Sequence, residues 1–369
     1  MQLNRLNILN FKNIAHCELA LSSGINCFTG DNGAGKTNVV DAVYYLSMCK
    51  SALSMTDGQS IRHGEEFFML EGDYTAAGER SERIVCSYAR RGESAGKRVK
   101  RNGKEYDRLA DHIGLVPVVI VSPADSFLIT EVEERRRWLN SFLSQLDREY
   151  LEAAVRYNRV LGERNTMLRN MAPSASDLLE IFDERLAAHA AVIHDRRSVL
   201  VERLRTLAER YYAALSGERE EVELHYRSDL NDSDMVSLLH RAKARDMECR
   251  YTTVGVHRDD MVMKIGGYPL RKFGSQGQQK SFLIALKLAQ YTILAEHCGH
   301  KPLLLLDDLF DKLDEGRVEQ LIGLVAGGSF GQIFITDCNK VRLRNILDRS
   351  GEEYSLFRVS QGAVEQELQ

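Results

Sequence analysis

The sequence has no segment that could cross a membrane or direct secretion. Across its 369 residues, no stretch approaches the run of about twenty apolar residues that a bilayer-spanning helix requires. The opening segment, MQLNRLNILNFKNI, interrupts every apolar run with asparagine or charge, which is not a secretory pattern. We therefore expect a cytoplasmic protein with no membrane association.

The sequence also lacks paired cysteines and an excess of positive charge. Seven cysteines are scattered without a C-x-x-C pair, a distribution typical of reduced thiols rather than of a disulfide framework or a zinc site. The formal net charge of −4 excludes a uniformly basic nucleic-acid binder. Any DNA-binding surface must therefore be a local patch.

A phosphate-binding loop is present near the N-terminus. The octapeptide GDNGAGKT fits G-x-x-x-x-G-K-[ST], follows a short apolar strand and precedes a helix expected from Lys36 to about Met48. Backbone N–H groups of such a loop surround phosphates, the lysine reaches the β- and γ-phosphates, and the threonine is placed for Mg²⁺. A purely structural glycine-rich turn is the alternative. The residues expected at the nucleotide are Gly30, Asp31, Asn32, Gly33, Ala34, Gly35, Lys36, Thr37 and Asn38.

An acidic pair follows a four-leucine run in LLLLDDLFDKLD. Asp307 and Asp308 come at the C-terminal end of an expected buried parallel strand, the edge where ligands collect in such sheets. Asp307 is suited to coordinating Mg²⁺, and Asp308 to positioning or deprotonating an attacking water. Alternatively, Asp308 caps the next helix.

The segment KFGSQGQQKSF begins a long expected helix, from about Gln276 to Cys298. Ser275 is a good N-cap, and the N–H groups of a helix start bind anions, so Ser275, Gly277 and Gln278 are candidates for a second phosphate contact. A helix about 33 Å long overshoots the short strand that follows it, which would display these residues away from their own phosphate loop. The pattern favours a site completed by another subunit over a capped structural helix.

Together these motifs resemble the ABC-type ATPase heads of the SMC class and, more narrowly, the RecF family of bacterial recombination mediators. The resemblance rests on NFKNI, GDNGAGKTNVVDAVYYL, GVHRDD, FGSQGQQKS and LLLLDDLFDKLD, including Leu313 and Asp314, and extends nearly end to end. It implies ATP and Mg²⁺ as cofactors and a head-to-tail homodimer in which each signature covers the partner's nucleotide. By similarity, Lys12 and Asn13 also have a role beside the phosphates.

The resemblance predicts an α/β fold: an ABC-type P-loop ATPase head with a mixed sheet and an inserted compact helical lobe. Residues 1–130 would form the N-terminal part of the ATPase lobe with a basic hairpin, 131–216 the helical lobe, and 217–369 the C-terminal part with the signature and the acidic strand. The segment ITDCN offers Thr336 and Asp337 where transporters carry a switch histidine, so we expect slow hydrolysis.

The local basic patch is expected in RRGESAGKRVKRNGK, whose glycine-containing turns suggest a hairpin. Its seven basic residues against one glutamate favour phosphate contacts over a merely solvated loop. No recognition-helix, RRM or zinc pattern occurs, so backbone contacts should dominate over base reading. The candidate DNA-binding residues are Arg90, Arg91, Lys97, Arg98, Lys100, Arg101 and Lys104.

The leading hypothesis is an ATP-driven clamp on duplex and gapped DNA. The resemblance implies a weak, DNA-dependent ATPase that helps direct RecA loading together with RecR and RecO. The alternatives are another SMC-like ATPase of DNA maintenance or defence and, least favoured, a transporter ATPase subunit. The atypical signature and the absent switch histidine argue against the transporter.

Overall fold

The protein is described from a computed structural model, in which residues 1–53, 55–75, 80–92, 95–170, 179–217, 220–309, 315–326, 329–350 and 353–367 are defined. The expected residues Leu313 and Asp314, and residues 93–94 of the basic segment, lie outside these ranges. The chain forms two compact units. Unit 1 consists of Met1–Asp125, Ala214–Gly217 and Lys287–Gln369, and unit 2 of Ser126–Ala213 and Glu218–Leu286.

Unit 1 contains a mostly parallel sheet whose central strands are entirely buried, as expected for near-continuous apolar runs. Its edge strand β15 is antiparallel to β14, and the other neighbours pair in parallel. The strands, in spatial order, are β15 (Ala363–Glu367), β14 (Tyr354–Ser360), β3 (Ile25–Thr29), β13 (Ile333–Asp337), β12 (Leu303–Asp307) and β8 (Val118–Val121). The carboxyl ends of β3, β13 and β12 meet at one edge, where the phosphate loop and the acidic pair follow.

A second, antiparallel sheet of unit 1 alternates buried and exposed residues along its strands, so that one face covers a core. The strands, in spatial order, are β2 (Ile14–Ala20), β1 (Gln2–Phe11), β4 (Phe67–Thr75), β5 (Ser81–Ala89), β6 (Gly96–Arg101) and β7 (Lys104–Glu105). This sheet supplies the predicted basic hairpin, as strands β6 and β7.

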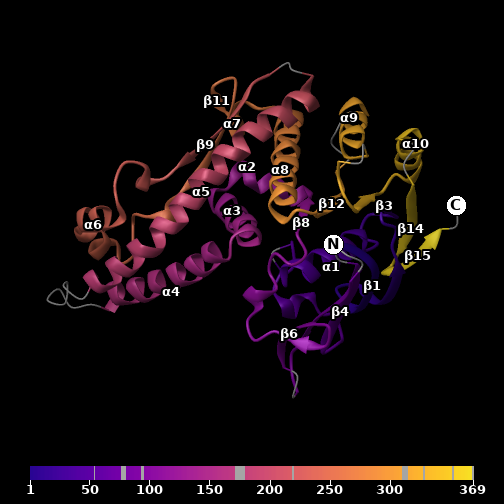
Figure 1. Ribbon diagram of the computed structural model, residues 1–369, viewed down its shortest axis with the longest axis horizontal. Helices are drawn as coiled ribbons and strands as arrows, with labels where there is room; N and C mark the ends of the chain where they lie inside the picture. The colour runs from indigo at the N-terminus through magenta and orange to yellow at the C-terminus, as the bar shows by residue number, and fades with distance from the viewer. Residues whose placement is uncertain are drawn as a thin grey trace. The chain divides into compact units, whose positions relative to one another are not determined.

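Helix α1 (Lys36–Met48) packs against both sheets of unit 1 (Figure 1). Ile8 and Leu70 from the antiparallel sheet and Leu305 and Phe334 from the parallel sheet share one core with it. Because both sides of the helix are covered, its apolar residues do not form a single stripe. The helix that follows the phosphate loop is therefore anchored along almost its whole surface.

Unit 2 combines helices with a small antiparallel sheet. Its elements are α2 (Phe127–Thr130), α3 (Val132–Leu146), α4 (Arg148–Asn170), α5 (Leu179–Ser216), β9 (Val222–Arg227), α6 (Met235–Cys249), β10 (Asp260–Ile265), β11 (Tyr268–Pro269) and α7 (Leu270–Phe273). Buried ion pairs join the sheet to the helices: Arg135 Nε lies 2.6 Å from Asp260 Oδ1, and Arg197 Nη1 lies 2.7 Å from Asp259 Oδ2. For this reason residues 218–286 group with the helices, whereas the sequence division had placed them with the ATPase part.

The remaining helices are α8 (Gln276–Cys298), α9 (Glu315–Ala326) and α10 (Lys340–Ser350), and α8 begins in unit 2 and ends in unit 1. Short 3-10 turns occur at Asp57–Ser60, Leu109–Asp111, Pro123–Ser126, Asp229–Asn231 and Val256–Arg258. Among the described helices, none is long and apolar enough to cross a bilayer. Mixed sheet and inserted helices confirm the predicted fold class.

Candidate functional site

The phosphate loop has a backbone shape that glycine adopts most readily. Gly30, Gly33 and Gly35 have φ values of 155°, 80° and 116°. A Cβ on Gly30 would lie 2.1 Å from the carbonyl oxygen of Val359, and one on Gly35 would lie 2.7 Å from the side-chain amide of Asn13. Gly35 is also the N-cap of α1 and has no side chain to accept from the first turn. The Asn38 N–H donates to the Gly35 carbonyl oxygen at 3.0 Å, and the N–H groups of Lys36 and Thr37, at the very start of the helix, are in the position where an anion binds.

The loop borders a cavity of about 310 Å³ in unit 1. The residues that line it are Asn32, Gly33, Gly35, Lys36, Thr37, Asn38 and Asp308. The Lys36 ammonium is held over the loop, donating to the carbonyl oxygens of Gly30 at 2.7 Å and Asp31 at 2.9 Å. A phosphate in the cavity would compete for this ammonium, whose partners among the described residues are neutral carbonyls.

Asp307, the last residue of β12, lies beside the loop. Its Oδ1 accepts hydrogen bonds from the Thr37 hydroxyl at 2.9 Å and from the Thr336 hydroxyl at 2.7 Å. Burial raises the pKa of Asp307; the two hydroxyl bonds oppose this shift, and the neighbouring carboxylates of Asp308 and Asp41 add to it. A cation here would relieve that repulsion. The Thr37 hydroxyl and the Asp307 carboxylate fit Mg²⁺, which binds through one or two carboxylates and takes other oxygens from phosphates.

Asp308 turns sharply away from the strand. Its φ is 49°, in the left-handed region, and its N–H donates to the Thr336 hydroxyl at 2.9 Å. Asp308 thereby lines the same cavity as Lys36. Thr336 contacts both aspartates: its hydroxyl donates to the Asp307 carboxylate and accepts from the Asp308 N–H. It can do so because Thr336 and Asp307 are register partners in the parallel sheet. The sequence singled out Thr336 only as a substitute for a histidine; its position at the end of a buried strand was the available signal.

Of the two residues assigned by similarity, only Asn13 contacts the loop directly. Its Nδ2 donates to the Ala34 carbonyl oxygen at 3.0 Å, and its Oδ1 accepts from Asn38 at 2.8 Å. The Lys12 ammonium instead lies 2.5 Å from Asp41 on α1, and both side chains are buried, at 6% and 1% exposure. Lys12 is not among the residues that line the cavity. Its contact with phosphate therefore stays a prediction.

Asp41 was missed by the sequence reasoning. Besides Lys12, its carboxylate accepts from the Ser51 hydroxyl at 2.8 Å and the Ala52 N–H at 2.6 Å. A carboxylate between Val40 and Ala42 in an apolar helix was the signal, because a buried charge requires a partner.

The signature segment, in unit 2, forms a capping box at the start of α8. The Ser275 hydroxyl accepts from the Gln278 N–H at 3.2 Å, and the Ser275 N–H donates to Gln278 Oε1 at 2.6 Å. The Gln278 Nε2 donates to Glu220 at 2.6 Å. A Cβ on Gly274 would lie 2.7 Å from Leu270, so the preceding glycine permits close packing. Ser275 remains exposed and Gly277 partly so, and their contact with a nucleotide stays a prediction.

The basic hairpin separates its cations by strand alternation. Lys97 and Arg101 lie on the side of the buried Val99, where the Lys97 ammonium is 2.9 Å from Asp57 and Arg101 binds Glu82 through two hydrogen bonds of 2.8 and 2.6 Å.

The other five DNA-binding candidates lie on the opposite side of β6 or in the neighbouring turns. Arg98 and Lys100 point to the opposite face of β6 and are partly exposed, and Arg98 forms a long ion pair, 4.0 Å from its Nε to Glu105 Oε1. Arg90, Arg91 and Lys104 are exposed. These five form what we call the outer basic face: Arg90, Arg91, Arg98, Lys100 and Lys104.

A phosphate loop and an acidic strand at one edge of a parallel sheet define a P-loop ATPase head, and the signature segment at a capped helix start is typical of the ABC type. The sequence of residues 2–363 matches the family model of the RecF/RecN/SMC N-terminal domain. The DNA replication and repair protein RecF of Bacteroides thetaiotaomicron is 45% identical over 365 residues, covering 99% of this chain and 98% of that protein. RecF of Flavobacterium johnsoniae is 42% identical over 97% of this chain and 100% of its own length.

Solved structures agree with this assignment. The recombination mediator protein RecF bound to ATP, from the RecFOR pathway, has a TM-score of 0.88 and 29% identity, covering 100% of this chain and 98% of that one. An Smc head bound to the C-terminal winged-helix domain of ScpA has a TM-score of 0.58 at 13% identity, over 100% of this chain and 97% of that one, which supports the fold alone. The chain belongs to the RecF family of SMC-type ATPases.

Proposed function

We propose that the protein is an ATP-dependent DNA clamp of recombinational repair. ATP binding joins two copies head to tail, the signature of each covering the nucleotide of the other, and the dimer holds duplex DNA near a single-strand gap. Slow hydrolysis, with Asp308 positioning water, separates the copies. Through RecR and RecO the clamp helps direct RecA loading. The solved RecF relative belongs to the RecFOR pathway, which supports the partnership with RecR and RecO.

The observation that carries the proposal is the cavity in which Lys36, Thr37 and Asp308 converge beside Asp307. Its donors match a nucleotide's phosphates and its oxygens match Mg²⁺, and in this proposal Asp308, which lines the same cavity, acts on a water near the terminal phosphate. Mg²⁺ would supply charge neutralisation between the phosphates. The exposed Ser275 at a capped helix start supports a contact made with a second copy.

The deciding experiment is light scattering of the purified protein without nucleotide, with ADP and with ATP, each with and without short duplex DNA. We expect the mass to double only with ATP and the dimer to retain DNA. A constant monomer under every condition would show that the signature has no partner site. The protein would then share the fold of its family but not the proposed dimer mechanism.

Two variants separate nucleotide binding from dimerisation. Lys36→Ala should abolish both, because the ammonium is lost from the phosphate cavity. Ser275→Arg should leave ATP binding to the monomer within about twofold but block the dimer. If Ser275→Arg weakens monomer binding as much as Lys36→Ala does, the signature acts within one copy instead.

The hairpin geometry predicts which basic residues contact DNA. Reversing charge at Arg98 and Lys100, on the outer basic face, should lower duplex affinity and reduce the log–log salt slope by about two. Neutralising Lys97 and Arg101 should mainly destabilise the hairpin, because both are bound to carboxylates. An unchanged slope in the first variant would make the segment a solvated loop.

A further inference from the structure

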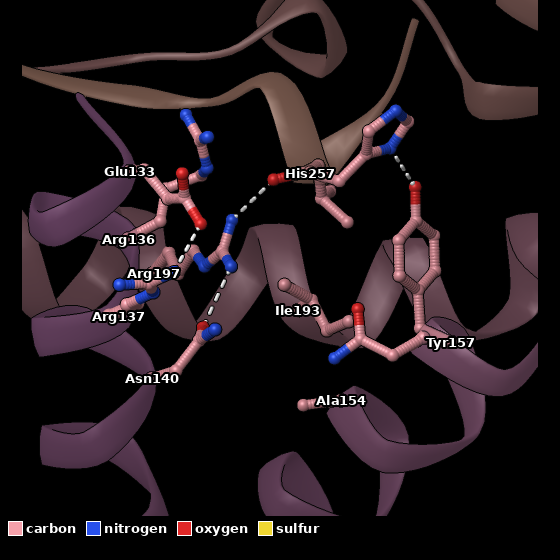
Figure 2. Close-up of a pocket in the computed structure, with 11 residues that line it drawn as sticks. Glu133, Arg136, Arg137, Asn140, Ala154, Tyr157, Ile193, Arg197 and His257 are labelled. Atoms are coloured by element: carbon pink, nitrogen blue, oxygen red, sulfur yellow. Dashed lines mark hydrogen bonds and ion pairs between the residues drawn. The ribbon is translucent and has the colours of Figure 1, made fainter. Parts of the chain in front are cut away.

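Unit 2 contains a cavity of about 300 Å³ that the nucleotide site does not involve. Residues of α3, α4 and α5 and of the turn before β10 border it, with arginine and asparagine side chains on one wall (Figure 2). Ala154 and Ile193 provide an apolar floor. Three arginines line this cavity against a single glutamate, in a chain whose net charge is −4.

Two of these arginines are already neutralised. Arg197 is buried, and its guanidinium donates to Asp259 at 2.7 Å, to the Val256 carbonyl oxygen at 2.7 Å and to Asn140 at 2.8 Å. Arg137 forms ion pairs with two glutamates of its own helix, one of which, Glu133, is labelled beside it in Figure 2. Neither guanidinium requires a further anion.

Arg136 differs from both. It is half-buried, and its Nη1 donates to the backbone carbonyl oxygen of Asp259 at 3.1 Å. Among the residues that the structure describes, it forms no ion pair with a carboxylate. Burial lowers the pKa of the Arg136 guanidinium and the neighbouring Arg197 lowers it further, whereas the carboxylates of Glu133 and Asp260 partly oppose this shift. A partly desolvated cation beside another cation favours binding of an anion.

Asn140 supplies a second donor whose orientation is determined by its neighbours. Its Oδ1 accepts from the Tyr150 hydroxyl at 2.5 Å and from Arg197 at 2.8 Å. With two donors on the oxygen, the opposite end of the amide must be the NH₂ group. Within the described ranges of the chain, no acceptor is bound to that NH₂ group.

His257 borders the cavity without adding charge. Its Nε2 faces the Thr252 carbonyl oxygen at 3.1 Å and must carry the proton, so its Nδ1 accepts from the Tyr157 hydroxyl at 2.8 Å (Figure 2). Burial lowers the pKa of His257 to about 4, which keeps the ring neutral at pH 7. The available positive charge therefore belongs to Arg136.

We propose that this cavity binds a phosphate group, with the Arg136 guanidinium and the Asn140 NH₂ as its donors. A tetrahedral phosphate presents oxygens to donors from separate side chains, which a planar carboxylate does less readily. The cavity is larger than one phosphate, so it leaves room for an ester substituent. The phosphate can be free or part of a nucleic-acid backbone, and the site lies entirely in unit 2, apart from the nucleotide cavity.

The test uses the full chain carrying Lys36→Ala, which removes phosphate binding at the loop. Broadening of the ³¹P NMR signal of inorganic phosphate measures binding, with chloride at matched ionic strength as the control. The only tryptophan, Trp138, lies on the same helix α3 but does not line the cavity, so its fluorescence shows whether α3 stays folded in each variant.

Three variants make the phosphate experiment specific. Arg136→Gln and Asn140→Asp should each reduce binding at least tenfold. Asn140→Asp keeps the oxygen that Tyr150 and Arg197 bind and replaces only the NH₂ group, so the fold should persist. The matched control is Arg159→Gln, because Arg159 is exposed on α4 and pairs with Glu163 away from the cavity.

A second arm distinguishes the source of the phosphate. Duplex DNA affinity is measured against salt for the chain with an intact loop, in the presence of ATP, with and without Arg136→Gln. A salt slope reduced by about one would assign the site to a backbone phosphate. An unchanged slope with lost ³¹P broadening would assign it to a free phosphate. If Arg136→Gln changes neither measurement, the proposal is overturned.

Discussion

The buried ion pair of Lys12 and Asp41 offers a test that separates a structural role from a nucleotide role. Replacing Lys12 by Met keeps an unbranched chain of similar length but leaves the Asp41 carboxylate, 1% exposed, without its cation. Removing one member of a buried ion pair typically costs about 3–5 kcal/mol. For a unit of about 200 residues, that loss corresponds to a fall in Tm of roughly 10 °C.

Part of the stability lost in Lys12→Met should return when the unpaired charge of Asp41 is also removed. Asp41→Asn in the Lys12→Met background keeps the oxygen that accepts from the Ser51 hydroxyl or the Ala52 N–H and abolishes the charge. We expect the double variant to be more stable than Lys12→Met alone, a coupling that a double-mutant cycle measures.

The assay is urea unfolding followed by far-ultraviolet circular dichroism and, separately, by Trp138 fluorescence. The pair lies in unit 1 and Trp138 in unit 2, so the transition seen by dichroism should shift more than the one seen by fluorescence if the units unfold separately. ATP affinity is measured in parallel on the folded variant. Unchanged stability together with at least a tenfold loss of ATP affinity would refute this reasoning and assign Lys12 to the phosphates.

Three further predictions follow from buried groups. Gly35→Ala should weaken ATP binding strongly in equilibrium dialysis and cost about 1–3 kcal/mol in urea unfolding, because φ is 116° and the added carbon meets an amide at 2.7 Å; an unaffected variant would mean that the loop can relax. Arg164→Leu leaves the carboxylates of Asp183 and Asp246, each 2.7 Å from the guanidinium, without their cation. The free energy of unfolding should therefore fall by about 3–5 kcal/mol at pH 7.5. Burial already raises the pKa of Asp183, and losing Arg164 raises it further. The folded state then holds a proton that the unfolded chain lacks, so stability falls with rising pH and the deficit should shrink toward pH 4 in unfolding series; a pH-independent deficit would indicate lost packing alone. Asp307→Asn should keep its hydroxyl contacts but lose the Mg²⁺-dependent gain in ATP affinity, as a titration with and without Mg²⁺ would show; an equal gain in both proteins would exclude Asp307 as the metal ligand.

The sequence alone determined the parts of this protein that depend on local backbone chemistry. The glycine spacing of the phosphate loop requires a left-handed backbone that few other residues adopt, so motif and loop shape follow together. The LLLLDD run specified a buried strand with its acidic pair at the exit, and Ser275 and Gln278 specified a capped helix start. Such features need only neighbouring residues, and the fold class followed from the family resemblance that these motifs carry.

Only the tertiary structure decided which charges are available. Lys12 and Lys97 are both basic residues at turns or hairpins in the sequence, yet each is bound to a carboxylate distant along the chain, Asp41 and Asp57 respectively. Arg136 sits in a run of three arginines that looks uniform in the sequence, and it alone of the three forms no carboxylate ion pair in the described chain. Pairing of this kind is set by long-range packing, which brings together groups whose separation along the chain carries no periodic signal.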